Sequence, residues 1–362
     1  MHPSIRPTVR ELVMQFGWNA TAYQILNPGI RHWQPTSRDA VVGYVRKGNW
    51  WLVAGAPVCE LSRLVEVTKE LEQAAAREGC FVCYVCAAGR LQQLFAPAVS
   101  HSTITIGAEP VWDPHHWPTI VAKRSSLRAQ LSRAKNKGVV IEHWPTDDPS
   151  RLATLRPILH QWLAMHALPP MHFLVEPDVL AGEMTDRLLL VAMQTDGVTR
   201  TPVAFLIASP VPARQGYLIE QIARGYAAPN GVAELLIDAA MHETASRGAN
   251  YVTLGLVALS THAQTEIAAN PRWLRWLMTW ARAHGRRFYH FDGLEQFRTK
   301  MEPDWWEPIY AITNRPAFTI GALHAVGRAF CDGSPELAVL RAIAKAARQE
   351  ATWAFSTRRF RG

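Results

Sequence analysis

Charged side chains of the types used in acid–base catalysis gather in the second half of the chain. A carboxylate can bind an ammonium group or accept a proton from a hydroxyl, whereas lysine and arginine can bind phosphates or stabilise an oxyanion. For Glu220 the simpler interpretation is an exposed strand residue, and for Asp292 an ordinary Asp-Gly turn. The candidate catalytic residues are Glu220, Arg224, Asp292, Lys300 and Glu307.

The stretch from Gly216 to Ser260 is predicted to position part of this chemistry. A helix that begins after a glycine turn presents unpaired N–H groups and the positive end of its dipole. Arg224 would lie beside that turn, so we expect an anion to bind there. The predicted elements are a strand at Tyr217–Ile222, a turn at Pro229, Asn230 and Gly231, a helix that begins at Gly231 and ends near Gly248, and a strand at Tyr251–Leu259.

A second charged stretch, from Val121 to Lys137, contains six basic residues and no acidic one. Leu127, Leu131 and Ala134 have helical spacing, and Gly138 follows as a helix-ending residue. We expect one basic helix that binds a polyanion; an ordinary solvated helix face is the alternative. The basic residues are Lys123, Arg124, Arg128, Arg133, Lys135 and Lys137.

The composition limits the class of protein. The chain has 362 residues, of which 48% are hydrophobic and 19% are charged, and its length favours two domains. No run approaches the roughly 20 apolar residues of a membrane span, and no apolar stretch follows the N-terminal charges. We therefore expect a cytoplasmic protein. Its net charge of +8 favours nucleic acid or an anionic membrane surface as partner.

Cysteine and histidine spacing does not favour a metal site. Cys80, Cys83 and Cys86 have C-x2-C-x2-C spacing, but they lie in an apolar stretch that predicts a buried strand. On a regular strand Cys83 would face away from the other two. His143, His166 and His172 lack metal-ligand spacing. We expect neither a metal nor a cofactor.

The remaining pattern predicts two α/β units of similar element order. The first contains two strands within residues 41–59, a helix at Leu61–Glu78, a strand at Phe81–Ala87, a short helix and another strand. The C-terminal helix Pro335–Phe355 and its basic tail pack on the protein or, alternatively, contact a membrane surface. The expected divisions are a first unit at 17–120, a connecting helix at 121–138, a second, catalytic unit at 139–315, and a helical tail at 316–362.

Several short motifs occur in a specific order. They are Asn27-Pro28-Gly29-Ile30-Arg31, the basic helix, Pro229-Asn230-Gly231, Leu254-Gly255 to Leu259-Ser260, Phe288 to Leu294, and Lys300 with Trp306-Glu307-Pro308 and Tyr310. With these motifs the chain resembles, over about residues 20–315, the C-terminal catalytic domain of bacterial phosphatidylglycerol lysyltransferase, the multiple peptide resistance factor family.

This resemblance implies two tandem acetyltransferase-like (GNAT) units with mixed sheets. It implies transfer of an aminoacyl group from charged tRNA to the hydroxyl of a membrane lipid such as phosphatidylglycerol, by a protein on the inner face of the cell membrane. The basic helix would meet the tRNA. Better-known members carry membrane helices that flip the product; none is predicted here, so we expect no flipping. The substrate-binding residues that the resemblance implies are Gln221, Asn230, Gly231, Gly255, Ser260, Arg298 and Tyr310.

One departure and two alternatives stay open. The family usually has Asp-x-x-Arg before the Asn-Gly turn, and here Gln221 replaces the Asp while Arg224 is kept. The amino acid and the acceptor are therefore open, as is the oligomeric state. An acyl-CoA-dependent N-acyltransferase is disfavoured because Ala228 stands where its pyrophosphate motif has Arg or Gln. A non-catalytic RNA-binding module lacks any recognised motif. No nucleophile elbow surrounds Ser260, so a covalent mechanism is not expected.

Overall fold

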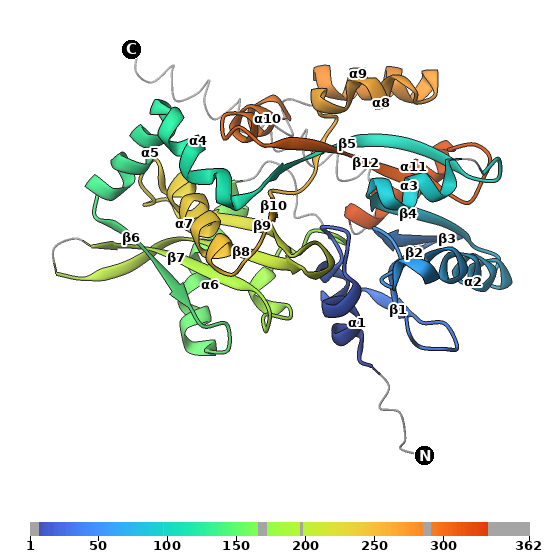
Figure 1. The fold of residues 1–362 in the computed structure, drawn as a ribbon, viewed down its shortest axis with the longest axis horizontal. Coiled ribbons are helices and arrows are strands. Elements are labelled where there is room, and N and C mark those ends of the chain that lie inside the picture. Colours follow the sequence, from blue (N-terminus) through green and yellow to red (C-terminus); the bar gives the residue numbers. More distant parts are fainter. Residues whose placement is uncertain (1–6, 97, 166–171, 196–197, 285–290, 332–362) are drawn as a thin grey trace, which may run out of the picture.

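The computed structural model describes residues 7–96, 98–165, 172–195, 198–284 and 291–331. Within these ranges one twelve-stranded mixed sheet runs through the molecule in the order β1-β2-β3-β4-β12-β5-β10-β9-β8-β7-β6, with β11 paired to β5 (Figure 1). The strands are β1 (Arg31–Trp33), β2 (Val42–Lys47), β3 (Trp50–Ala54), β4 (Phe81–Ala87), β5 (Ser102–Trp112), β6 (Val139–Trp144), β7 (Leu188–Thr195), β8 (Arg200–Val211), β9 (Gly216–Arg224), β10 (Tyr251–Thr253), β11 (Val257–Ala258) and β12 (Trp305–Thr313).

Helices cover both faces of this sheet. In the second half of the molecule α5 and α7 pack on one face, and α6 packs on the other. The helices are α1 (Val9–Phe16), α2 (Leu64–Arg77), α3 (Gly89–Phe95), α4 (Trp117–Lys123), α5 (Ser125–Asn136), α6 (Pro149–Met165), α7 (Val232–Ser246), α8 (Gln264–Ala268), α9 (Arg272–His284), α10 (Phe291–Thr299) and α11 (Ile320–Phe330). None in the described ranges is both long and apolar enough to cross a bilayer.

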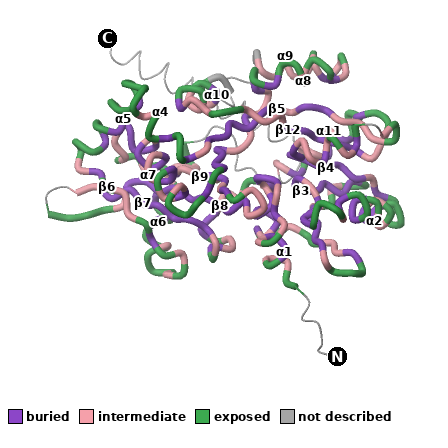
Figure 2. Tube along the Cα trace, viewed as in Figure 1, coloured by how far each residue is buried: buried purple, intermediate pink, exposed green. Residues whose placement is uncertain are grey.

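The predicted fold class is confirmed. The chain is α/β with a mixed sheet, and the predicted first-unit order of two strands, helix, strand, helix and strand is observed from β2 to β5. Apolar strand residues form separate clusters on the two faces of each half, and the buried segments follow the strands (Figure 2). The predicted C-terminal helix at 335–355 lies outside the described residues.

One strand from the expected second unit pairs with strands of the first unit. β12 was expected in the second unit, but it lies between β4 and β5 and pairs antiparallel with both. β10 in turn pairs with β5, so the two half-sheets are continuous. The residues of β12 therefore lie where the halves meet, which a division of the sequence at fixed residue numbers did not anticipate.

The basic stretch that was predicted as one helix is divided into two. The chain forms α4 and then α5, with an extended backbone at Arg124 between them. Arg128 donates hydrogen bonds to the carbonyls of Val121 and Ala122, where α4 ends. Arg124 forms an ion pair with Glu302. Two of the six basic side chains thus stabilise the break between the helices.

The cysteine run lies in a buried strand region, as predicted. Cys86, however, lies on the same side as Cys83 and not on the side of Cys80. Cys83 and Cys86 share one core cluster and Cys80 lies in another. Cys86 has a positive φ of 61°, which interrupts the alternation of side chains along β4. Burial raises the pKa of the Cys59 thiol to about 11, so this thiol is un-ionised at neutral pH. His166 lies outside the described residues.

Candidate functional site

Two carboxylates lie side by side where the half-sheets meet. Glu109 of β5 and Glu307 of β12 are direct partners on neighbouring antiparallel strands. Directly opposite residues point to the same face, with Cβ atoms about 5 Å apart. The side chains of this pair thus meet on the face of the sheet toward which Arg214 also reaches.

Arg214 neutralises one of these carboxylates. Its guanidinium donates to both oxygens of Glu307, over 2.7 Å and 2.5 Å, and lies 3.7 Å from the ring centre of Tyr251. Trp305 Nε1 donates to Glu307 over 2.9 Å. Burial disfavours ionisation of Glu307, but these hydrogen bonds outweigh it and lower its pKa. Glu307 is therefore an ionised carboxylate whose oxygens accept hydrogen bonds from Arg214 and Trp305. We call Glu109, Glu307, Arg214 and Tyr251 the central cluster.

Glu109 is the carboxyl group of the central cluster without a hydrogen-bond partner among the described residues. The residue is 3% exposed. Burial, and next the negative charge of Glu307, raise its pKa to about 7, while Arg214 and Arg298 oppose the shift. A carboxyl group with this pKa exchanges a proton near neutral pH, which is what a general acid–base catalyst needs. Glu109 was not predicted as a site residue, because its strand carries no recognisable motif.

Beside the central cluster the strands β9 and β10 separate. They pair in parallel only from Gly216 to Leu218, after which β9 continues without β10 as far as Arg224. The backbone turns away at Gly255, which has φ +72°, and Arg298 donates to the carbonyls of Leu254 and Gly255 over 2.5 Å and 2.6 Å. A strand edge that pairs with no described strand can hydrogen-bond an extended ligand.

Gln221 lies on the separated part of β9. Its side chain is buried, and its Oε1 has no hydrogen-bond partner among the described residues. A buried polar atom without a partner is costly in the absence of a ligand or water. This observation agrees with the predicted role of Gln221 in substrate binding.

Glu220, predicted as a catalytic residue, forms a buried ion pair in the structure. A bulge in β9 falls at this residue, and its carboxylate binds the fully buried guanidinium of Arg187 over 3.0 Å and 3.2 Å. Arg187 also donates to Asn27 Oδ1 over 2.9 Å. The pair therefore joins the second half of the chain to the first, and both oxygens of Glu220 are engaged.

Several other predicted site residues make structural contacts. Ser260 is buried and donates to Glu295 over 2.8 Å. Tyr310 packs in a core cluster of the first half. Gly231 has φ +92°, and a Cβ there would clash with the Gln130 carbonyl of α5. The glycine is needed for close approach of α5 and α7, so it requires no anion to explain it.

Three predicted residues stay at the surface. Arg224 and Asn230 are exposed at the end of β9 and in the turn before α7, and Lys300 is exposed after α10. Among the described residues none of them hydrogen-bonds to the central cluster. The side chain of Asp292 lies outside the described residues. The structure thus brings Glu307, Arg298 and Gly255 together near Glu109, with Gln221 farther along β9, and no contact joins Arg224, Asn230 or Lys300 to the central cluster within the described residues.

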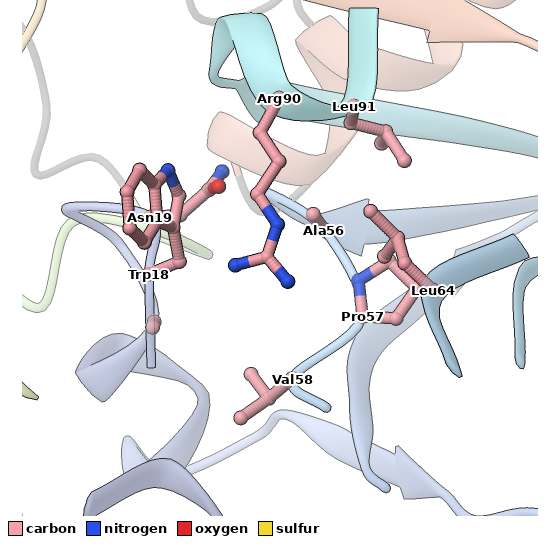
Figure 3. A pocket seen from close by; sticks show the side chains of 9 residues that line it. Trp18, Asn19, Ala56, Pro57, Val58, Leu64, Arg90 and Leu91 are labelled. Atoms are coloured by element: carbon pink, nitrogen blue, oxygen red, sulfur yellow. The ribbon is translucent and has the colours of Figure 1, made fainter. Parts of the chain in front are cut away.

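A hollow on the first half holds a guanidinium that has no acidic partner within the described residues. Arg90 points between Trp18 and Asn19 on one side and Pro57, Val58 and Leu64 on the other (Figure 3). Its Nε is buried and lacks a hydrogen-bond partner among the described residues, and burial lowers the pKa of Arg90. Arg90 and Arg214 each lie 5.2 Å from the Trp18 ring, which connects the hollow to the central cluster.

The part of the chain that the structure describes contains no group of three or more His, Cys, Asp and Glu residues arranged to bind a metal ion. The described acidic side chains of the site are instead paired with arginines, except for Glu109. The described charged side chains of the site therefore suit charge stabilisation and proton transfer.

Comparison with known protein families identifies one family. A family model described as "Phosphatidylglycerol lysyltransferase, C-terminal" matches residues 10–313. No curated protein matches the chain.

Solved structures share the fold. The C-terminal domain of a putative lysylphosphatidylglycerol synthetase from Agrobacterium fabrum is 21% identical, with 90% of this chain and 96% of that chain covered and a TM-score of 0.70. L-PGS from Bacillus licheniformis is 18% identical, with coverage of 89% and 96% and a TM-score of 0.72. FemX is 8% identical, with coverage of 90% and 94% and a TM-score of 0.53.

Proposed function

Because the chain belongs to the family of phosphatidylglycerol lysyltransferase C-terminal domains, we propose that it moves an aminoacyl group from charged tRNA to the hydroxyl of phosphatidylglycerol or a related lipid. The family consists of aminoacyltransferases that act on a lipid, so the chain is an enzyme of that class. The tRNA donor and the residue roles that follow are our proposal.

The observation that carries the proposal is the unequal carboxylate pair. Glu307 is held ionised by Arg214. Glu109 beside it is buried and has no hydrogen-bond partner among the described residues, and its pKa of about 7 suits a general base at neutral pH. Two neighbouring carboxyl groups with separated pKa values commonly divide the roles of charge stabilisation and proton transfer. We assign proton transfer to Glu109.

The proposed reaction is a transesterification, in which the aminoacyl group passes directly from the tRNA ester to the lipid hydroxyl. Glu109 accepts the proton of the lipid hydroxyl as its oxygen bonds to the acyl carbon. The bond from that carbon to the ribose oxygen of the tRNA then breaks, and Glu109 returns the proton to the leaving oxygen. The donor ester is already activated, so positioning and charge supply most of the acceleration. Burial of Glu109 also limits competing hydrolysis by water.

Other side chains are proposed as substrate contacts. Gln221 and the uncovered edge of β9 would bind the aminoacyl group, since Gln221 Oε1 lacks a partner among the described residues. Arg90 has no acidic partner among the described residues and suits a phosphate. Exposed Arg224 and Lys300 would contact phosphates where a substrate enters.

The packing of Gly231 supports tRNA over acyl-CoA as donor. An acyl-CoA enzyme of this fold needs an open helix N-terminus for its pyrophosphate. Here the Gln130 carbonyl of α5 packs against Gly231, directly before α7 begins. A carbonyl oxygen at that position repels an anion, in agreement with the absence of Arg or Gln at Ala228.

Purified protein tests the function directly. It should be incubated with tRNA charged with labelled amino acids and with vesicles that contain phosphatidylglycerol, and the label should be followed into the lipid phase. We expect an aminoacylated lipid whose mass identifies both amino acid and acceptor. Free amino acids with uncharged tRNA serve as the control. Label transfer from acyl-CoA, with none from charged tRNA, would replace this proposal by the acyltransferase alternative.

Charge reversal on α5 and just beyond it is expected to weaken tRNA binding. Lys135 and Lys137 are exposed, and neither takes part in the break between α4 and α5. The double variant Lys135→Glu/Lys137→Glu should bind more weakly, and the slope of log K against log salt should fall by about two. Filter binding at several salt concentrations measures this. The matched control is Lys69→Glu on α2, and equal losses in both variants would count against a specific tRNA surface.

A further inference from the structure

Helix α9 is fixed to the sheet at both ends. Directly before it, the Asn270 side chain accepts from the backbone N–H of Thr105 over 2.8 Å and donates to its carbonyl over 2.9 Å. In its last turns Arg282 donates to the Leu259 carbonyl over 2.6 Å and to Glu295 over 2.7 Å. These polar anchors hold the helix in one orientation at the edge of the molecule, where Figure 1 shows it beside α8.

The two faces of α9 differ in an unusual way. The inner face is apolar: Leu274 is buried, and Leu277 and Met278 pack against the core of the first half. The outer face carries Trp276 and Trp280, which are 69% and 51% exposed. Their spacing of four residues places them one turn apart on the same stripe.

The charged residues of α9 itself are all basic, and one of them, Arg282, is paired with Glu295 of α10. The helix sequence RWLRWLMTWARAH contains three arginines and no acidic residue. Arg272 is exposed and precedes Trp276 by one helical turn. Exposed tryptophans on a helix of basic character are typical of segments that lie in the interface of an anionic bilayer. The indole ring favours the boundary between headgroups and acyl chains.

We propose that the outer face of α9 docks on the surface of an anionic lipid bilayer, with Trp276 and Trp280 inserted among the headgroups and Arg272 beside lipid phosphates. The protein's net charge of +8 favours the same partner. The docking is a binding event separate from acyl transfer, so it does not depend on the proposed reaction. It would bring the enzyme to the membrane in which its lipid acceptor lies.

The test is co-sedimentation of the 362-residue chain with vesicles of equimolar phosphatidylcholine and phosphatidylserine. These vesicles are anionic but lack the proposed acceptor, so binding in the active site does not contribute. We expect Trp276→Ala/Trp280→Ala to reduce partitioning about tenfold or more, because two large apolar side chains lose their burial in lipid. Arg272→Glu should reduce it further at low salt.

The control is Leu61→Ala/Val65→Ala, which removes two exposed apolar side chains from η2 (Leu61–Arg63) and α2. It should bind vesicles like the parent, and thermal unfolding should show both double variants folded. Unchanged partitioning of the tryptophan variant would overturn the proposal. So would a parent protein that self-associates in sedimentation velocity while the tryptophan variant is monomeric, because a second copy would then be the occupant of this face.

Discussion

Glu109→Gln is expected to lower the rate of lipid aminoacylation by roughly two to four orders of magnitude, the usual contribution of a general base. The amide keeps the size of the carboxyl group but accepts no proton at neutral pH. Substrate binding should change little, so the loss should appear in kcat. Steady-state transfer of labelled aminoacyl groups to lipid, measured against charged tRNA concentration, separates kcat from KM.

The pH dependence gives a second readout for Glu109. A base with a pKa of about 7 is active when deprotonated, so the parent rate should rise with pH through about 7. The residual rate of Glu109→Gln should lack this rise. The charged groups that shift the pKa of Glu109 are Glu307 on β12, Arg214, and Arg298 on α10. Glu109 in turn raises the pKa of Tyr251 on β10 and of Cys86 on β4.

Stability should change in the opposite sense from activity. The pKa of Glu109 is raised above its usual value of 4.5, so the folded protein retains a proton that the unfolded chain has lost. Stability from this group therefore falls as pH rises from about 4.5 to 7. At pH 8 Glu109→Gln should melt no lower than the parent, since it removes a buried charge. Glu142→Gln on β6 is the conservative control. A destabilised variant with an unchanged pH profile would indicate a structural role.

Removal of Glu220 is expected to produce the largest loss of stability, about 3–5 kcal/mol. Glu220→Ala leaves the Arg187 guanidinium buried, with Asn27 and Ser209 as its nearest neutral acceptors. An uncompensated charge in the interior is far more costly than the pair itself. Chemical denaturation of the parent and the variant, with equal slopes, gives the difference directly.

The double variant Arg187→Met/Glu220→Leu distinguishes a structural role of Glu220 from a catalytic one. Replacement of a buried ion pair by apolar residues of similar size is often neutral or stabilising, so much of the lost stability should return. Because we assign Glu220 a structural role, this variant should also transfer aminoacyl groups at a temperature where it is folded. A stable double variant without activity would restore Glu220 as a catalytic residue.

The sequence by itself determined the local elements and the class of protein. Periodicity located the first-unit strands and helices because the burial of one face is a local property of the pattern. The order of short motifs identified the family, whose model matches residues 10–313. The sequence pattern pointed to Gly231 as part of an anion site, whereas in the structure the glycine allows the close approach of α5, a contact between distant segments.

The tertiary structure alone decided which charged residues meet. Glu109 and Glu307 are almost two hundred residues apart in the numbering, and they become neighbours because β12 inserts between β4 and β5. In the same way Arg187 forms an ion pair with Glu220, and Arg128 hydrogen-bonds to the end of α4. The function of a charge depends on its partners and its burial, and long-range strand pairing sets both. No pattern of spacing along the chain contains that information.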